Sequence, residues 1–526
     1  MRRWNGWGDD AIHLPLPQSA LTFLRERVGE PTRPADVSFD FIVRNVAASR
    51  LPDDPRIDAT ARTRLLHARG QSLPDWLALR FGNIDCVPDG VAFPQSSQDV
   101  RDLLAFAKAH HVDVIPYGGG TSVVGHINPL PSQTPVLTIS LAHMRQLIDL
   151  DAQSGLATFA AGVNGPDLEA QLRARGYTLG HFPQSFEYAT LGGWIVTRSS
   201  GQQSLRYGRI EQLFAGGQIE TPSGSMRIPT FPASSAGIDI RGLVLGSEGR
   251  LGIVTEATVR VRTLPKHESF HGWFFPNWKQ AQAGVHELVN AGLPLSMMRL
   301  ANPLETLTTL RLAGGNLVRL LEGYLALRGS RNEKCLLLVG ITGDEDPCAA
   351  ALVRAKAILS KHAGIYSGTR LGKRWEHNRF RGVYLRNSLW EAGYAVDTVE
   401  TAVDWPRVAS MAQAIESTAR NALGEERVHA YTHLSHVYTQ GSSVYSTFIF
   451  RIAPDYETNM QRWRALKTAV SQTIVAEGGT ISHQHGVGVD HKPYLAAEKG
   501  ALGIEAMRAL FAQFDPDGMM NPGKLV

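Results

Sequence analysis

The sequence is poor in cysteine: among 526 residues only Cys86, Cys335 and Cys348 occur, without a Cys-x-x-Cys pair. Three scattered cysteines do not make a disulfide framework, so we expect a reducing compartment. Long apolar runs are also missing, because no stretch approaches the about 18 apolar residues of a membrane-spanning helix. The first residues, MRRWNGWGDD, lack the apolar core of a signal peptide. We therefore expect a cytoplasmic protein without a membrane span.

Blocks of basic residues are absent as well, and the net charge of +4 is small for this length. Nucleic-acid-binding proteins usually show a basic stripe, so no nucleic acid partner is expected. No Gly-x-Gly-x-x-Gly motif follows a predicted strand, and no Gly-x-x-x-x-Gly-Lys-Ser/Thr phosphate loop occurs. This disfavours a nicotinamide dehydrogenase and a nucleoside triphosphatase. The remaining composition, 43% hydrophobic and 19% charged, is that of a globular protein with roughly three domains.

The most informative segment that is present is PYGGGTSVVGH, residues 116–126. It follows a β-type run at residues 112–115 and contains three consecutive glycines. Because glycine has no Cβ, the backbone of Gly118, Gly119 and Gly120 can adopt positive φ and approach a ligand closely. Successive N–H groups of such a loop can cradle a pyrophosphate. A tight surface turn is the alternative interpretation of three glycines alone.

Two further segments favour the phosphate interpretation. They are PQSFEYATLGGWIVTR at residues 183–198 and GSEGRLG at residues 246–252. Together with the glycine loop they resemble the FAD-binding half of the vanillyl-alcohol-oxidase type flavoproteins. The resemblance implies a PCMH-type FAD-binding domain made of two α/β subdomains.

The apolar periodicity predicts an α+β fold in four parts. Residues 1–84 are expected to be a mostly helical segment and residues 85–267 the FAD-binding domain. A cap domain with an antiparallel sheet and helices on one face should follow at 268–479, and residues 480–526 should return to the active site. Within these parts, Ser97 is expected to cap a helix, and residues 243–245 and 253–261 to be strands. Residues 504–514 predict a helix with one apolar stripe.

Six separated motifs narrow the resemblance. In chain order they are SFEYATLGGWIVTRSSGQQSLRYGRIEQL, MMRLANP, YLRNSLWEAGYAVDTVETAVDW, THLSHVYTQGSSVY, GGTISHQHGVG and MNPGKL. They resemble the alkyldihydroxyacetonephosphate synthase (alkylglycerone-phosphate synthase) family over nearly the whole chain from Asp85. The resemblance implies non-covalent FAD and exchange of the acyl chain of acyl-dihydroxyacetone phosphate for a fatty alcohol. This step of ether lipid synthesis is redox-neutral and uses a flavin N5 adduct. The resemblance further implies a homodimer with peripheral membrane contact.

By this resemblance, three segments hold FAD. The glycine loop contributes Pro116, Tyr117, Gly118, Gly119, Gly120, Thr121 and Ser122. The second segment contributes Pro183, Gln184, Ser185, Phe186, Glu187, Tyr188 and Ala189, followed by Val196, Thr197, Arg198 and Ser199. The last contributes Gly246, Ser247, Glu248, Gly249, Arg250, Leu251 and Gly252. His126 lies off the usual attachment position, so no covalent flavin link is expected.

The resemblance also assigns roles outside the flavin site. Tyr445 matches the general acid/base tyrosine, Arg386 the arginine that binds the substrate phosphate, and Arg299 an arginine important for activity. His483 and His485 fall on the histidine cluster of the family. In the implied mechanism, Arg386 anchors the phosphate and Tyr445, assisted by His483 or His485, removes a C1 proton.

On their own chemistry these residues allow simpler interpretations. Tyr445 opens an apolar run, where a buried core tyrosine is the ordinary case. An unperturbed phenol has a pKa of about 10, and we expect Arg386 and the histidines to lower it. Arg386 lies in a helix-like run and could be a surface residue, although a guanidinium suits phosphate oxygens well.

His483 and His485 are two residues apart, so in an extended segment both side chains would point to one face and Gln484 to the other. Such a pair is sometimes a metal site, but a third ligand at the usual spacing is missing, and we predict no metal. Histidines near a flavin more often move protons. The synthases carry three consecutive histidines where this chain has Gln484 in the middle, and glutamine can hydrogen-bond but cannot titrate.

Two other functions stay open. An FAD-dependent 2-hydroxyacid dehydrogenase or oxidase of the D-lactate or glycolate type has the same fold and a similar MNPGKL end. Those enzymes carry a His-x-Gly-Asp-Gly-Asn-x-His metal segment, whereas this chain has HVYTQGSSVY at 436–445, which lacks the Asp, the Asn and the second His. A non-catalytic flavin-binding protein is the third hypothesis, for which Gln484 is the only indication.

Overall fold

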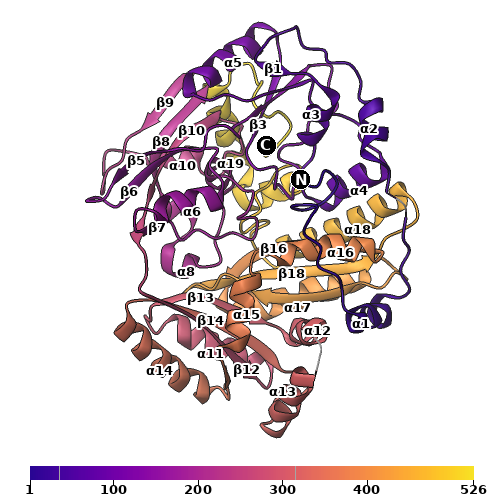
Figure 1. Cartoon of the computed structure of the whole chain (residues 1–526), viewed down its shortest axis with the longest axis vertical. Coiled ribbons are helices and arrows are strands. Elements are labelled where there is room, and N and C mark those ends of the chain that lie inside the picture. Colours follow the sequence, from indigo (N-terminus) through magenta and orange to yellow (C-terminus); the bar gives the residue numbers. More distant parts are fainter. Residues whose placement is uncertain (35, 314–315) are drawn as a thin grey trace.

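The computed structural model describes residues 1–34, 36–313 and 316–526 of the chain. Two halves face each other, one in indigo to magenta and one largely in orange (Figure 1). The first half contains the segment predicted to bind FAD, residues 85–267, and is called the flavin half; it is built on a four-stranded and a five-stranded sheet. The second half, called the cap, is built on one sheet of seven strands. This arrangement confirms the predicted α+β class.

The four-stranded sheet, with the order β1-β2-β4-β3, leads into the glycine loop. β2 (Gly90–Ala92), β4 (Val136–Ser140) and β3 (Asp113–Tyr117) are parallel, and β1 (Ile57–Asp58) pairs antiparallel at the edge. α5 (Ser97–Ala109) connects β2 to β3. Its N-cap is Ser96 and not the expected Ser97, because Ser96 and Asp99 form a reciprocal capping box.

The five-stranded sheet is antiparallel, with the order β5-β6-β10-β8-β9. Its strands are β5 (Leu147–Asp151), β6 (Leu156–Ala160), β8 (Phe214–Thr221), β9 (Gly224–Ile228) and β10 (Ile253–Arg260), the last as predicted. The expected strand at 243–245 is wrong. These residues belong to or follow the short helix α10 (Arg241–Val244), because the Asp239 carboxylate accepts the Arg241 N–H and turns the chain.

Shorter elements surround this sheet. They are α6 (Gly165–Arg173), α7 (Leu191–Thr197), α8 (Ser204–Tyr207), α9 (Ile210–Leu213) and the pair β7 (Tyr177–Thr178) and β11 (Arg262–Thr263). α6 begins at Asn164, whose side chain accepts the Asp167 N–H, and the chain turns at Gly176 with φ of 82°. A shared apolar core joins both sheets of this half, from Val114 and Ile139 to Phe214 and Val259.

The regular elements of the N-terminal segment are mainly helices, although these cover less than half of residues 1–84, and the segment does not stand apart from the flavin half. Its helices are α1 (Gln18–Val28), α2 (Phe39–Asn45), α3 (Ala61–Leu66) and α4 (Leu73–Phe81), and β1 extends the first sheet. The first residues form a hairpin closed by an Arg2–Asp9 bridge, with Trp7 buried. α4 contacts α18 (Tyr456–Ala476) of the other half, so the segment packs on both halves.

The seven-stranded cap sheet is antiparallel, as predicted, with the order β15-β12-β14-β13-β17-β18-β16. Its strands are β12 (His267–Phe275), β13 (Leu295–Ala301), β14 (Cys335–Gly343), β15 (Ile365–Gly368), β16 (Tyr394–Asp404), β17 (His429–Leu434) and β18 (Gly441–Arg451). Its helices are α11 (Trp278–Val289), α12 (Pro303–Ala313), α13 (Asn316–Leu327), α14 (Glu345–Lys361), α15 (Arg370–Asn378), α16 (Leu385–Glu391), α17 (Trp405–Asn421) and α18 (Tyr456–Ala476).

The strand alternation divides the cap side chains between two faces. Trp273 and Phe275 of β12 join the core that α11, α14, α17 and α18 cover. Phe270 and Phe274 of the same strand face the other way and pack with residues of α12 and α15, which form a partial second layer at that end. Near β16 and β18, the sheet face opposite α17 and α18 is turned toward the flavin half (Figure 1).

The C-terminal segment returns to the flavin half, where α19 (Leu495–Phe514, yellow) lies among the violet elements (Figure 1). The predicted apolar stripe at 504–514 packs on the flavin core, and Gly500 breaks the helix with a φ of 70°. Met520 then bridges to Val114 of β3. Among the described residues, none of the helices combines the length and apolar character needed to span a bilayer.

Candidate active site

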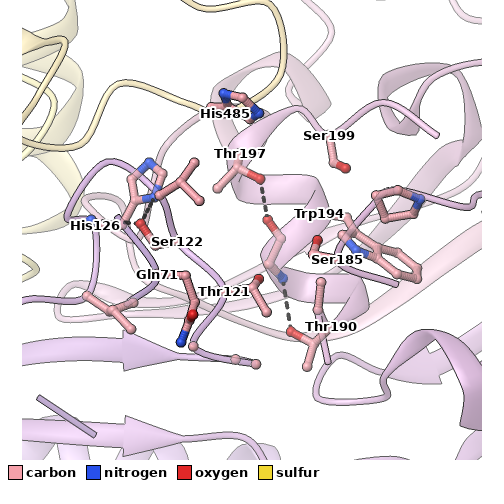
Figure 2. Close-up of a pocket in the computed structure, with 18 of the residues that line it drawn as sticks. Gln71, Thr121, Ser122, His126, Ser185, Thr190, Trp194, Thr197, Ser199 and His485 are labelled. Atoms are coloured by element: carbon pink, nitrogen blue, oxygen red, sulfur yellow. Dashed lines mark hydrogen bonds between the residues drawn. The ribbon is translucent and has the colours of Figure 1, made fainter. Parts of the chain in front are cut away.

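A cavity of about 260 Å³ lies between the flavin half and the cap sheet. All seven residues predicted in the glycine loop, 116–122, line it. From the other predicted segments, the lining residues are Pro183, Gln184, Ser185, Ala189, Val196, Thr197, Ser199, Glu248, Gly249 and Gly252. Figure 2 shows Thr121, Ser185 and Thr190 grouped around its centre, with His485 beyond them. Residues far apart in the chain therefore form one site.

The other predicted cofactor residues do not line this cavity. They are Phe186, Glu187, Tyr188, Arg198, Gly246, Ser247, Arg250 and Leu251. Several instead support the lining residues: Phe186 is buried in the flavin core, and Tyr188 packs edge-on against Trp7 with ring centroids 5.7 Å apart. The sequence motif marks the whole turn, whereas only its inward-facing residues reach the cavity.

The glycine loop fits the phosphates of a dinucleotide cofactor. A Cβ on Gly119 would lie 1.8 Å from the Tyr188 carbonyl oxygen, so the backbone passes closer to the facing segment than any other residue allows. The amides of Gly119, Gly120 and Thr121 donate no hydrogen bond to any described residue. Free amides at a cavity wall are the donors that a pyrophosphate needs.

The N-terminal segment contributes a wall that the sequence analysis missed. Trp7, Gln71 and Ser72 line the cavity, and the Arg2 guanidinium donates a hydrogen bond of 2.5 Å to the Gly119 carbonyl. The Gln71 side chain donates to the Gly6 carbonyl and links the hairpin to this wall. A local sequence motif could not have identified these residues as part of the cavity wall, because their contacts join segments about 65 or more residues apart.

His126 lines the cavity, and each of its ring nitrogens lies close to a polar side chain. Nδ1 lies 2.7 Å from Ser122 Oγ, and Nε2 lies 3.1 Å from the Glu248 carboxylate. The same Glu248 carboxylate accepts N–H groups of Val487 and Gly488 from the C-terminal segment. These contacts do not test the absence of a covalent flavin link, which stays a prediction.

Arg386 enters the cavity from α16 of the cap and is half-buried rather than on the surface. Its guanidinium stacks on Trp76 at 4.4 Å from the ring centroid and donates to the Gln71 carbonyl at 2.7 Å. Burial lowers the pKa of Arg386. The remaining donors of this fixed, planar cation are suited to an anionic ligand.

Tyr445 lines the cavity from β18, in register with Glu400 on β16 and His433 on β17. Directly paired residues of antiparallel strands share one face, and the Tyr445 ring stacks on His433 at 4.8 Å. Burial raises the pKa of Tyr445 to about 12, and Glu400 acts in the same direction. The expected lowering of this pKa is therefore wrong, because burial and a carboxylate outweigh Arg386.

Arg299 does not line the cavity and reaches Tyr445 only through His433. Its guanidinium contacts the Glu305 carboxylate and lies 3.1 Å from His433 Nδ1. His433 Nδ1 also lies 2.9 Å from Glu305. Burial alone would raise the pKa of Glu305, but Arg299 and His433 hold it at about 2. Arg299 thus stabilises the ring that supports Tyr445.

The histidine segment is a loop and not an extended strand, so the expected division between two faces is wrong. His483, Gln484 and His485 all turn toward one buried carboxylate, that of Glu400. Gln484 and His485 line the cavity, whereas His483 lies behind it, between Glu400 and Arg209. Burial lowers the pKa of His485. Glu400 was missed because a lone acid in a strand-like run carries no motif.

Glu400, His436 and His483 bring three potential metal ligand atoms within 4.8 Å of one another. Of the His483 and His485 pair considered from the sequence, only His483 belongs to this group. However, the Arg209 guanidinium lies 2.9 Å from His483 Nε2, so a positive charge already stands beside these ligand atoms. A cation beside this arginine would be repelled, so the absence of a metal stays our prediction.

Comparison with known proteins places this site in a family. Residues 88–228 match the model of an FAD binding domain, and residues 264–525 match that of the C-terminal domain of FAD linked oxidases. The alkyldihydroxyacetonephosphate synthase of Dictyostelium discoideum is 30% identical over 100% of this chain and 93% of its own. The chain belongs to the alkyldihydroxyacetonephosphate synthase family. It is an FAD-dependent enzyme.

The structural comparison agrees with this assignment. A solved structure of an alkyldihydroxyacetonephosphate synthase superposes with a TM-score of 0.82 at 27% identity, covering 99% of both chains. The glycolate oxidase subunit GlcD of Bacillus subtilis is more distant, with 26% identity over 84% of this chain and 89% of its own. The synthase family therefore matches residues that the oxidase relative does not cover.

Proposed function

We propose that this enzyme exchanges the acyl chain of acyl-dihydroxyacetone phosphate for a fatty alcohol, a step of ether lipid synthesis. One observation carries the proposal: a single cavity joins the amides of the glycine loop to Arg386, Tyr445 and His485. A flavin site, a phosphate-binding cation and two proton-transfer groups thus share one space. A substrate with a phosphate and an acidic C–H group can contact the flavin, the cation and the proton-transfer groups at the same time.

Arg386 anchors the substrate phosphate in this scheme. Its stacking on Trp76 and its hydrogen bond to Gln71 fix the guanidinium plane, so little side-chain freedom is lost when the phosphate binds. The anchor lies on α16, next to the strand β16 that pairs with the strand of Tyr445. It therefore sets the distance between the phosphate and the carbon to be deprotonated.

His485 and Tyr445 divide the proton transfer. The lowered pKa keeps His485 neutral near pH 7, so its ring can accept a proton from C1 of the substrate. Tyr445 stays protonated, and its hydroxyl donates a hydrogen bond toward the departing acyl oxygen. The two rings lie edge to face with centroids 6.0 Å apart, which lets both contact one substrate.

The flavin is held by residues 116–122 and by the lining residues of the second and third cofactor segments. When bound, FAD supplies a nucleophilic ring nitrogen to a reaction without net oxidation or reduction. The buried walls around Trp194 and Tyr117 keep water away from this reaction. In this proposal, His483 and Arg299 do not line the cavity but position the catalytic residues.

An anaerobic incubation tests the function. The purified holoenzyme is mixed with acyl-dihydroxyacetone phosphate and a long-chain alcohol without an electron acceptor, and products are identified by mass spectrometry. Alkyl ether and released fatty acid in equal amounts are expected. Absence of ether, together with flavin bleaching by a 2-hydroxyacid, would instead identify an oxidoreductase of the glycolate or D-lactate type.

The proposal extends to membrane contact, a homodimer and a cytoplasmic location. An apolar stripe on α13 supports the first: Leu320, Tyr324 and Leu327 are exposed at helical spacing, and Leu327 is 89% exposed. Sedimentation with phospholipid vesicles tests the contact, and Leu327→Glu is expected to weaken it. Light scattering after gel filtration tests the dimer.

A further inference from the structure

Glu400 lies beneath the histidine loop (residues 481–488) and is almost fully buried, with 2% of its surface exposed. Its carboxylate accepts a hydrogen bond of 2.6 Å from Gln484 Nε2 and one of 2.8 Å from Ser435 Oγ. His483 Nδ1 lies 3.3 Å and His485 Nε2 4.0 Å from the same carboxylate. One buried charge is thus shared by three consecutive side chains of the loop.

The backbone of Glu400 holds the loop as well. Its carbonyl oxygen accepts the N–H of His483 at 3.0 Å. The other end of the histidine loop is fixed from the flavin half, where Glu248 accepts the N–H groups of Val487 and Gly488. His485 lies between these two attachments, so its position follows from both glutamates.

The carboxylate of Glu400 remains ionised in this setting. Burial alone would raise its pKa, but the neighbouring His483 lowers that pKa well below its usual value. A buried anion is costly when its hydrogen bonds are missing. The donor on Gln484 is therefore required by Glu400, and an amide supplies it at every pH.

We propose that Glu400 is a positioning residue, which holds His485 against Tyr445 through its hydrogen bond from Gln484. This inference rests on the function proposed above. It also gives Gln484 a definite role. Where the synthases have the middle one of three histidines, this chain has a side chain that can donate a hydrogen bond but cannot titrate. The position accordingly demands a donor to Glu400 and not a histidine as such.

Three variants at Gln484 test the donor. Gln484→Met keeps the length of the side chain but removes the donor, Gln484→His restores a donor, and Gln484→Glu places a second carboxylate beside Glu400. We expect kcat to fall about 10- to 100-fold in the Met variant, with a larger loss in the Glu variant. The His variant should lie within about threefold of the unchanged enzyme. KM for the phosphate substrate should change little, because Arg386 is untouched.

Hydrogen exchange of the holoenzyme gives a readout that does not depend on turnover. The His483 amide is expected to exchange faster in Gln484→Met and at the original rate in Gln484→His. FAD content and melting temperature serve as controls for folding. Unchanged exchange and kcat in the Met variant would overturn the inference, and so would a His variant as impaired as Met. If the unchanged enzyme forms no ether, the exchange rates still decide the role of Glu400.

Discussion

Replacing Tyr445 by phenylalanine removes one hydroxyl group from the cavity and leaves the ring in place. The stack on His433, at 4.8 Å and 17°, is kept, and so is the edge contact with His485. We therefore expect the free energy of unfolding to change by no more than about 1 kcal/mol. FAD content should also be unchanged, because Tyr445 belongs to the cap wall.

The rate, in contrast, should fall by about 10²- to 10⁴-fold, the usual contribution of a positioned acid or base. With a pKa of about 12, only about one molecule in 10⁵ carries ionised Tyr445 near pH 7. A mechanism that needs the ionised form would make kcat/KM rise about tenfold per pH unit above neutrality. A protonated Tyr445 beside a neutral His485 predicts a plateau over the same range.

The assay is ether formation as a function of pH for the unchanged enzyme and Tyr445→Phe. Tyr366→Phe is the matched control, because Tyr366 lies on β15 and contacts His271 rather than the cavity. Since burial lowers the pKa of His485, the plateau should begin below about pH 6.5. A tenfold rise per pH unit, or a fully active Tyr445→Phe variant, would refute the division of roles.

Three other changes probe the remaining walls and the buried charges. Arg386→Lys loses the stack on Trp76 and the planar donors, so KM for the phosphate substrate should rise about 10- to 100-fold at unchanged FAD content. Gly119→Ala should abolish FAD binding, measured as the ratio of absorbance at flavin and protein wavelengths, whereas Gly242→Ala, whose new Cβ meets nothing within 4 Å, should retain it. Burial raises the pKa of Asp490 to about 7, so ionising it destabilises the fold as the pH rises above its unfolded value. Asp490→Asn should therefore raise the melting temperature clearly more near pH 8 than near pH 5; equal shifts at both pH values would contradict this.

The sequence predicted those parts of the site that are contiguous in the chain. The glycine loop could be recognised because only glycine tolerates the contact at Gly119, and this constraint is local. Tyr445 and Arg386 were identified by resemblance, but their surroundings were not. The lowered pKa expected for Tyr445 was wrong because burial depends on the packing of the whole sheet.

Residues that act across long distances escaped prediction. Glu400 pairs with Tyr445 across two strands, and Gln71 meets Arg386 from the N-terminal segment. The two-residue period placed His483 and His485 on one face, yet the segment forms a loop in which the Gln484 side chain and the His483 N–H donate to Glu400. Tertiary contacts decide such cases, because a short polar segment has little conformational preference of its own.

The strand register that aligns Glu400, Tyr445 and His433 makes insertions far more consequential than most substitutions. One extra residue inside β18 would turn Tyr445 away from the cavity and expose Val444 to it, since neighbouring side chains alternate. An extra residue in the connection between β17 and β18, at 435–440, would leave that frame intact. Insertions and deletions among relatives should therefore occur in the connection at 435–440, while the number of residues in β18 stays constant.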